Sequence, residues 1–241
     1  MDERLGEDAR AAGNEARGPI RIDLGFVNAY LLPAAEGFVL VDAGTAAHCA
    51  KLEAALGRAG CGKGDLRLIV LSHADPDHGG CAAALAAAYG APIALHPGEL
   101  PQFERGETPR RSGRGLAAKL FVAFANRPGK PAAAGRSALE LGEGSSLAEY
   151  GLEARVLHLP GHTPGSIALL LGDGSLVAGD ILANMRRPGL SPFVWDARRY
   201  DESLARLQGL AGSIATVYPG HGSPFPGEAI LGIEPLGGSR P

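Results

Sequence analysis

One short segment, residues 72–80, is dense in side chains that bind metal ions. It reads Ser-His-Ala-Asp-Pro-Asp-His-Gly-Gly and follows an apolar run. Imidazole and carboxylate groups suit zinc, iron and manganese, and burying several of them without a cation or mutual pairing would be costly. In an extended loop, side chains at alternate positions project alike, so this loop can serve two adjacent metal ions. Its candidate ligands are His73, Asp75, Asp77 and His78.

Three more candidate ligands, His162, Asp180 and His221, occupy comparable places further along the chain. Each follows an apolar, strand-like run and lies in or beside a turn marked by Gly or Pro. Strands that end at a common edge would present all these groups to one cleft. The alternative is a surface cluster of ion pairs, which does not account for ordered motifs at four separated strand ends.

The elements that must position these groups alternate between strands and helices. Strands are predicted at 20–26, 28–33 and 37–45, a helix at 47–59 before Gly60, a strand at 66–72, a helix at 79–89 before Gly90, and a strand at 91–97. This order predicts a strand–helix–strand crossover with parallel pairing.

The second part of the chain is again rich in strands. Predicted elements are a strand at 152–159, a hairpin at 166–180 that turns at Gly172-Asp173-Gly174, a helix at 201–210 and a last strand at 214–219. We therefore expect a mixed α/β fold in which helices cover sheets, and two strand-rich parts that are compatible with two layered halves.

Composition excludes several classes of protein. The 241 residues are 45% hydrophobic and 20% charged with a mean hydropathy of +0.03, which is typical of an ordinary globular protein. The net charge of −3 does not favour nucleic acid as a partner, and no apolar run is long enough to span a membrane. The three cysteines are odd in number and form no CxxC pair, which argues against a disulfide scaffold and favours a reducing, cytoplasmic compartment.

Residues 1–18 are predicted to be a loose tail, and 19–241 a single domain with an insertion or lid at about 97–137. Residues 105–136 contain eight basic residues and one acidic residue, which gives this segment a net charge of +7 (8 − 1). A solvated helix face with flexible flanks and a site for an anionic substrate or a membrane surface both remain open for this segment.

These motifs resemble the metallo-β-lactamase-fold superfamily, whose signature is HxHxDH followed by distant His, Asp and His. The resemblance runs from Ile20 to Pro226, includes the VDAG element at 41–44, and implies a four-layer αββα sandwich. It implies one metal position at His73, Asp75 and His162, a second at Asp77, His78 and His221, and Asp180 as the bridge between them. It also implies that Asp42 orients ligands without touching a metal.

Asp75 departs from the family pattern, which usually has His at this position. The similar flavodiiron proteins have a carboxylate there and bind iron. An oxygen ligand shifts the expected metal from zinc toward iron or manganese. The alternative is that Asp75 points away from the metal and leaves the first metal position weak or empty. The resemblance thus implies two divalent ions, zinc or iron, with manganese as a further option.

The resemblance implies a hydrolase that uses metal-bound hydroxide, with Asp77 as the catalytic residue that helps orient it. The segments GHTPGS and GDIL look like those of thioesterases, glyoxalase II and lactonases, which favours a small ester, thioester or lactone substrate. Two alternatives stay open: an iron-dependent oxidoreductase related to the flavodiiron core, and a non-catalytic metal- or ligand-binding protein. We expect a small-molecule substrate and neither nucleic acid nor membrane as a partner; the oligomeric state is open, with a dimer as one option.

Other residues have simpler explanations. His48, His96 and His158 are interpreted mainly as structural, with a substrate contact as an equal alternative for His96. Cys81 is interpreted as an apolar helix position, and a thiol ligand is the minor alternative. Phe193, Val194 and Trp195 are candidates for a pocket wall, with ordinary loop packing as the other option.

Overall fold

The computed structural model describes residues 18–107, 109–113, 116 and 138–237. Of the predicted tail, only Gly18 falls in this part of the chain. Much of the predicted insertion at 97–137 lies outside the described residues. Its description as a lid and the single-domain organisation of 19–241 therefore stay predictions.

The first half of the chain forms a six-stranded sheet in the order β1-β2-β3-β4-β5-β7. The first three strands pair antiparallel, and the strands from β3 to β7 pair parallel, which confirms the predicted crossover. The strands are β1 (Ile20–Asp23), β2 (Asn28–Pro33), β3 (Phe38–Val41), β4 (Leu66–Val70), β5 (Ile93–Leu95) and β7 (Leu139–Glu140).

The second half forms a five-stranded sheet in the order β13-β12-β10-β9-β8. β10 and β12 pair parallel, with register shifts on both sides of Gly179, and β9 and β10 form the predicted hairpin. The strands are β8 (Ala154–His158), β9 (Ile167–Leu171), β10 (Ser175–Asn184), β12 (Thr216–Gly222) and β13 (Phe225–Pro226). A separate small ribbon joins β6 (Ser112–Gly113) to β11 (Phe193–Val194).

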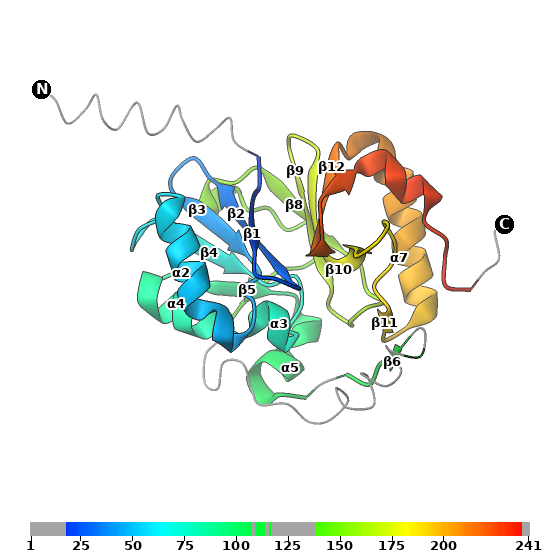
Figure 1. Cartoon of the computed structure of the whole chain (residues 1–241), viewed down its shortest axis with the longest axis horizontal. Helices are drawn as coiled ribbons and strands as arrows, with labels where there is room; N and C mark the ends of the chain where they lie inside the picture. The colour runs from blue at the N-terminus through cyan, green and yellow to red at the C-terminus, as the bar shows by residue number, and fades with distance from the viewer. Residues whose placement is uncertain (1–17, 108, 114–115, 117–137, 238–241) are drawn as a thin grey trace, which may run out of the picture.

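Helices cover the outer faces of both sheets (Figure 1). α2 and α4 lie against the first sheet, and α7 lies on the opposite side of the molecule against the second. The helices are α2 (Cys49–Arg58), α3 (Pro76–Gly79), α4 (Ala82–Tyr89), α5 (Leu100–Arg105) and α7 (Ala197–Leu210). Short 3-10 helices are η1 (Ala46–His48), η2 (Pro97–Glu99), η3 (Ala148–Tyr150), η4 (Ala211–Ser213) and η5 (Gly227–Gly232).

Three clusters of buried apolar side chains hold these layers together. In β2, Leu31 packs toward α2 and α4, whereas its neighbour Leu32 packs toward the second sheet, because successive strand residues face opposite sides. Leu204 and Leu207 of α7 pack on the outer face of the second sheet. Helix, sheet, sheet and helix therefore follow one another, and the predicted αββα sandwich is confirmed.

Several element boundaries differ from the prediction. The helix predicted at 201–210 begins at Ala197, because the Asp196 side chain accepts a hydrogen bond from Arg199 N and caps the helix there. The helix predicted at 79–89 begins later, at Ala82, and Gly79 is instead the last residue of the separate helix α3. The strand predicted at 214–219 continues to Gly222 and so carries His221 within β12.

The cysteine pattern argued against a disulfide scaffold, but the structure contains one disulfide bond. Cys49 and Cys81 form a disulfide between α2 and the residue before α4, with Cα atoms 5.4 Å apart, and Cys61 is a buried free thiol. An odd count and the lack of a CxxC pair say nothing about distances across the fold, which here brings together two residues 32 positions apart. The disulfide also excludes Cys81 as a thiolate ligand. A cytoplasmic location stays a prediction, now without support from the cysteines.

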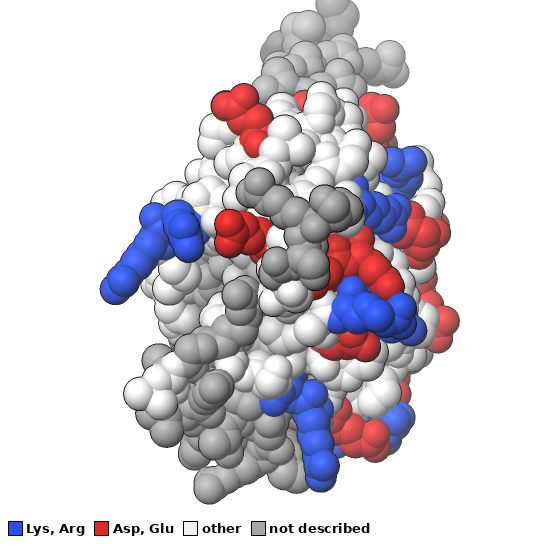
Figure 2. Space-filling model, turned by 90° about the vertical axis from the view of Figure 1, so that its right-hand side faces the viewer, with Lys and Arg blue, Asp and Glu red and all other residues white. Residues whose placement is uncertain are grey.

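None of the helices in the described residues combines the length and the apolar character that crossing a membrane requires. The face on the α7 side carries basic and acidic side chains intermixed (Figure 2). Ion pairs account for part of this mixing, such as Arg198 with Glu202 on α7 and Arg206 with Glu143.

Candidate metal centre

The seven candidate ligands converge where strands of both sheets end. His73 and Asp75 lie in the loop after β4, and Asp77 and His78 in α3. His162 lies between β8 and β9, Asp180 in β10, and His221 in β12. The groups His73/Asp75/His162 and Asp77/His78/His221 each place one ligand atom per residue within 4.8 Å of the others. We call them the first and the second ligand group.

In the first ligand group, one carboxylate oxygen faces two imidazoles. Asp75 Oδ2 lies 3.3 Å from His73 Nε2 and 3.4 Å from His162 Nε2. A zinc–nitrogen bond of about 2.0–2.1 Å in a tetrahedral site gives ligand–ligand distances of about 3.4 Å. This triangle of donor atoms therefore has the size that a metal ion requires.

The second ligand group is slightly wider and more open. Asp77 Oδ2 lies 3.5 Å from His221 Nε2 and 3.9 Å from His78 Nε2. His78 is fully buried, whereas the side chains of Asp77 and His221 are 27% and 15% exposed. The second ligand group is therefore the one that solvent reaches.

Asp180 lies between the two ligand groups. Its Oδ1 is 3.3 Å from His78 Nε2, and its Oδ2 is 3.2 Å from His221 Nε2 and 3.7 Å from His162 Nε2. One carboxylate thus faces imidazoles of both groups, which is the arrangement of a bridging ligand.

Hydrogen bonds within the loop and from Asp42 fix the conformation of the loop that carries the first four ligands. Asp75 occupies the extended position before α3, Pro76 begins the helix, and the backbone N–H groups of His78 and Gly79 donate to Asp75 O at 2.9 and 2.8 Å. Asp42, in the left-handed region at φ 61°, accepts hydrogen bonds from Ser72 N and Ser72 Oγ, both at 2.8 Å. This unusual backbone conformation aims the Asp42 carboxylate at the start of the loop.

A hydrogen bond at Nδ1 orients each imidazole in the centre. His78 Nδ1 donates to Asp42 Oδ2 at 2.8 Å, and His73 Nδ1 donates to Ser72 Oγ at 3.0 Å. Backbone carbonyls do the same elsewhere, Phe193 O for His162 at 2.9 Å and Phe26 O for His221. Because Nδ1 is the donor in these bonds, Nε2 is the nitrogen of each ring that faces the centre, and it can bind a metal ion once it is unprotonated. The role implied for Asp42 agrees with this geometry.

Two glycines allow the strands to approach this closely. A Cβ at Gly220 would collide with Asp180 Oδ1 and come within 2.9 Å of His78 Cε1. Gly179 has φ 51°, and a Cβ there would lie 2.5 Å from the Ser72 side chain. The glycines that precede His221 and Asp180 are therefore required by packing at the centre.

The donor atoms fit a metal better than they fit one another. Among the described residues, Nε2 of His73, His78 and His162 and Oδ1 of Asp180 are buried without a hydrogen-bond partner. Burying such groups unsatisfied is costly, and four of them at one point is unusual for a folded protein. A nitrogen and oxygen donor set of this kind suits zinc, iron or manganese.

The pKa values of two carboxyl groups of the centre, Asp180 and Asp75, are lowered. Burial raises the pKa of Asp180 and Asp75, but the imidazoles of His221 and His78 around Asp180, and the Arg111 guanidinium beside Asp75, hold both pKa values well below the usual range. Burial lowers the pKa of His78 and His221, yet nearby carboxylates raise the first well above its usual value and the second to about 9. Metal binding would therefore release protons from these two rings.

Arg111 is a site residue that the sequence analysis did not single out. Its guanidinium binds both oxygens of Asp75, and Gln102 Nε2 donates to Asp75 Oδ1 at 2.9 Å. The side chain of Arg111 is only 9% exposed, so at this position the solvated basic face considered for 105–136 is wrong. No local signal identifies Arg111 or Gln102, because each meets Asp75 across about thirty residues.

Glu99 is a second residue that the sequence analysis missed. It is buried, and its two carboxylate oxygens accept from Ala74 N and Gly165 N, both at 2.8 Å. One side chain thus ties the loop of the first ligands to the loop that carries His162.

The remaining candidates lie around the centre without joining either ligand group. His96 and His158 stack with ring centroids 3.9 Å apart, and His48 lies beside Phe26. Phe193 contributes its carbonyl to His162 and lies near that ring, which agrees with a wall of the site. Val194 is buried in the apolar cluster of the second sheet and α7, which agrees with ordinary packing. Trp195 donates its backbone N–H to Gly161 O, and its side chain as a pocket wall stays a prediction.

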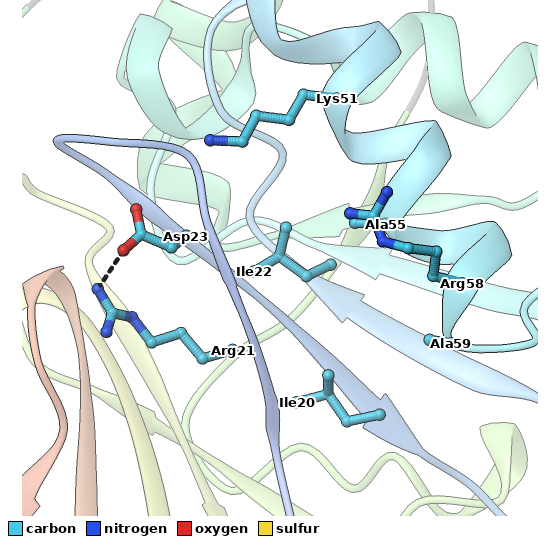
Figure 3. Close-up of a pocket in the computed structure, with 8 residues that line it drawn as sticks. All are labelled: Ile20, Arg21, Ile22, Asp23, Lys51, Ala55, Arg58 and Ala59. Carbon is cyan, nitrogen blue, oxygen red and sulfur yellow. Dashed lines mark hydrogen bonds and ion pairs between the residues drawn. The ribbon is translucent and has the colours of Figure 1, made fainter.

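A hollow of about 370 Å3 lies elsewhere, between β1 and α2 (Figure 3). It contains none of the seven candidate ligands, and Arg21 on its wall pairs with Asp23. We therefore place the chemistry at the converging ligands and not in this hollow. Its lining residues are Ile20, Arg21, Ile22, Asp23, Lys51, Ala55, Arg58 and Ala59.

Comparison with known proteins agrees with the geometry. The chain is 33% identical over 215 residues to a hydroxyacylglutathione hydrolase of Anaeromyxobacter dehalogenans, an alignment that covers 86% of this chain and 66% of that protein. It is 30% identical over 211 residues to the probable metallo-hydrolase YflN of Bacillus subtilis, covering 79% and 77% of the two chains. The crystal structure of TTHA1623 in a di-iron-bound form superposes with a TM-score of 0.63 at 30% identity, covering 89% and 97%.

The sequence profile of the metallo-β-lactamase superfamily matches residues 22–221, a span that includes all seven candidate ligands. The fold and the resemblance predicted from the motifs are thereby confirmed, as is the expectation of a metallohydrolase scaffold. This chain belongs to the metallo-β-lactamase superfamily.

Proposed function

We propose that this protein is a binuclear metal-dependent hydrolase that acts on a small ester, thioester or lactone. The observation that carries the proposal is the convergence of four imidazole Nε2 atoms and three carboxylates, each imidazole oriented through its Nδ1. The first ligand group would hold one ion, the second ligand group the other, and Asp180 would contact both.

Two bound divalent ions would lower the pKa of water from 15.7 toward about 7 and polarise the carbonyl of the substrate. The protein itself orients the reactants. Asp77 is the only carboxylate of the centre with substantial exposure among the described residues, so it is placed to accept a hydrogen bond from the attacking water. No side-chain nucleophile is needed.

The substrate class rests on the relatives. A hydroxyacylglutathione hydrolase is among them, and its name indicates a thioester substrate for that protein. We extend the general bond type, an activated acyl bond, to this chain. The small molecule is expected to approach from the side of Asp77 and His221, because the first ligand group is buried.

The metal is proposed to be zinc or iron, with manganese as a further option. Asp75 contributes a hard oxygen donor to the first ligand group, which favours iron or manganese over zinc at that position. A neighbour of the same fold has been crystallised in a di-iron-bound form. The same Asp75 supports a second candidate function, an iron-dependent oxidoreductase whose electrons come from a separate carrier protein.

The test combines metal analysis with a substrate panel. Protein purified without added metal is assayed for zinc, iron and manganese, and then for hydrolysis of thioesters, lactones and phosphodiesters. We expect two metal equivalents and turnover of a thioester or a lactone. Asp180→Asn should lower turnover by about 10³-fold, because loss of the shared ligand removes several kcal/mol of transition-state stabilisation.

Glu202→Gln is the matched control, since it replaces a carboxylate by an amide in an exposed α7 ion pair. It should leave turnover unchanged. Full activity of Asp180→Asn would contradict the hydrolase proposal. Consumption of oxygen or peroxide by the iron-loaded protein, without hydrolysis of any panel member, would favour the oxidoreductase.

A further inference from the structure

We propose that Arg111 makes the two metal positions unequal, weakening the ion held by the first ligand group relative to the ion held by the second. The inference rests on the proposed metal centre and adds to it a residue that binds the carboxylate of Asp75. It concerns the affinity for the ions and not the hydrolytic step.

Arg111 and the first ligand group share one oxygen atom, Asp75 Oδ2. Arg111 Nη1 donates to Asp75 Oδ2, the same atom that lies 3.3 Å from His73 Nε2 and 3.4 Å from His162 Nε2. Arg111 Nη2 donates to the other oxygen, Asp75 Oδ1. An ion bound by the first ligand group would therefore share its carboxylate with a guanidinium.

Burial makes this sharing costly. The side chains of Arg111 and Asp75 are 9% and 12% exposed, and His73 and His162 are buried. Two cations on one carboxylate repel each other strongly where water does not screen them. The Asp75–Arg111 pair is neutral as a whole, so it presents a metal with no more net charge than the neutral imidazole usual in the family.

The second ligand group has no such counter-cation. Among the described residues, the ion pairs of Asp77 are with His78 and His221, and none is with Lys or Arg. Its carboxylate is also partly exposed, which lowers the cost of charge there. The second ligand group is therefore expected to bind its ion first and more tightly.

Gln102 also holds Asp75 in place, so the effect of the Arg111 charge can be distinguished from the effect of positioning Asp75. Its Nε2 donates to Asp75 Oδ1 at 2.9 Å and to Ala74 O at 3.0 Å, and so ties the carboxylate to the loop. Asp75 therefore keeps a partner when the guanidinium is removed. A purely positioning role for Arg111 predicts weaker metal binding on its removal, whereas a charge role predicts tighter binding.

The test titrates metal-free protein with Co2+ and follows both calorimetry and the visible absorption of the bound ion. We expect two steps in the wild type, with affinities that differ by about tenfold or more. In Arg111→Met the weaker step should tighten by about tenfold, whereas in Arg111→Lys, which keeps the charge, it should stay within about threefold of wild type. Arg110→Met is the matched control, because Arg110 is exposed one position away, and it should change neither step.

Two further variants assign the steps. Asp75→Asn should abolish or weaken the weaker step, and Asp77→Asn the tighter one. A second readout is the melting temperature of the metal-free protein, which does not depend on metal binding. The melting temperature of Arg111→Met should fall below that of Arg110→Met, because Asp75 loses its buried counter-ion. Saturating Co2+ should remove this difference.

The inference would be overturned if the weaker binding step were unchanged or weakened further in Arg111→Met. It would also be overturned if this step tightened equally in Arg111→Lys. If Arg111→Met does not fold, Arg111→Gln, which keeps a hydrogen-bond donor, replaces it with the same expectations. Two ions of equal affinity in an active wild type would refute this inference alone. Failure of the wild type to bind either ion would refute the proposed function as well.

Discussion

The two ligand groups use similar donors in different surroundings. All three residues of the first are buried, and its carboxylate is enclosed by Arg111 and Gln102. In the second, only His78 is fully buried. The first ligand group is therefore enclosed by protein and the second is accessible to solvent, although Asp180 lies next to imidazoles of both.

The supports of the two groups differ in the same way. In the first, a hydroxyl and a backbone carbonyl, Ser72 Oγ and Phe193 O, hold the imidazoles. In the second, a carboxylate oxygen of Asp42 holds His78, and a backbone carbonyl, Phe26 O, holds His221. A carboxylate raises the basicity of the histidine it binds more than a neutral oxygen does. This adds to the expected tighter binding at the second ligand group.

The largest expected difference comes from the two carboxylates. Asp77→Asn should lower turnover by about 10²–10⁴-fold, because it removes the exposed group proposed to orient the attacking water. Asp75→Asn should lower it by only about tenfold, since it changes a ligand on the enclosed side and leaves the accessible side of the centre unaltered. Turnover at saturating metal measures both.

Glu202→Gln again serves as the control for replacing a carboxylate by an amide. Equal losses in Asp75→Asn and Asp77→Asn would break the distinction between an enclosed and an accessible group. A larger loss in Asp75→Asn would reverse it.

A smaller effect is expected from the supporting side chains. Asp42→Asn should weaken the tighter ion by about 10–100-fold, because the amide can no longer accept freely from His78 Nδ1 as the carboxylate does. Ser72→Ala should weaken mainly the other ion, through His73, and by less. Equilibrium dialysis with each variant measures these affinities, and the same loss for both ions in Asp42→Asn would argue against separate supports.

The smallest expected effect is on the pH dependence of stability and comes from His96, whose ring stacks on His158. Burial and the neighbouring His158 lower the pKa of His96 to about 4, from a usual value of 6.5. The unfolded chain therefore takes up a proton before the folded protein does, so this contribution to stability is complete above pH 6.5 and lost as the pH falls toward 4. Because His96 is partly exposed, we expect a loss of roughly 1–2 kcal/mol.

His96→Asn should lack this pH dependence while keeping an acceptor for Gly98 N, which His96 Nδ1 binds at 3.0 Å. Urea unfolding of the metal-free proteins at pH 7 and pH 4.5 measures the difference. Identical pH profiles for wild type and variant would show that His96 does not contribute.

The candidate ligands and most of the elements that carry them could be predicted from the sequence alone. His73, Asp77 and His78 follow a buried strand, and His162 and Asp180 lie beside Gly-marked turns, signals that are local and readable from residue type and spacing. The sandwich followed from the resemblance of these motifs to the superfamily. The predicted bounds of helices and strands were less accurate where a capping side chain sets the end of a helix, as Asp196 does at the start of α7.

Only the tertiary structure decided which residues surround the ligands. Arg111 and Gln102 meet Asp75, Glu99 joins two loops, and Cys49 meets Cys81, each across roughly thirty residues or more. Such pairings depend on where loops return after the sheets have packed, and no local pattern records that path. Ligand identity is a property of single side chains, whereas the electrostatic difference between the two ligand groups exists only between distant parts of the folded chain.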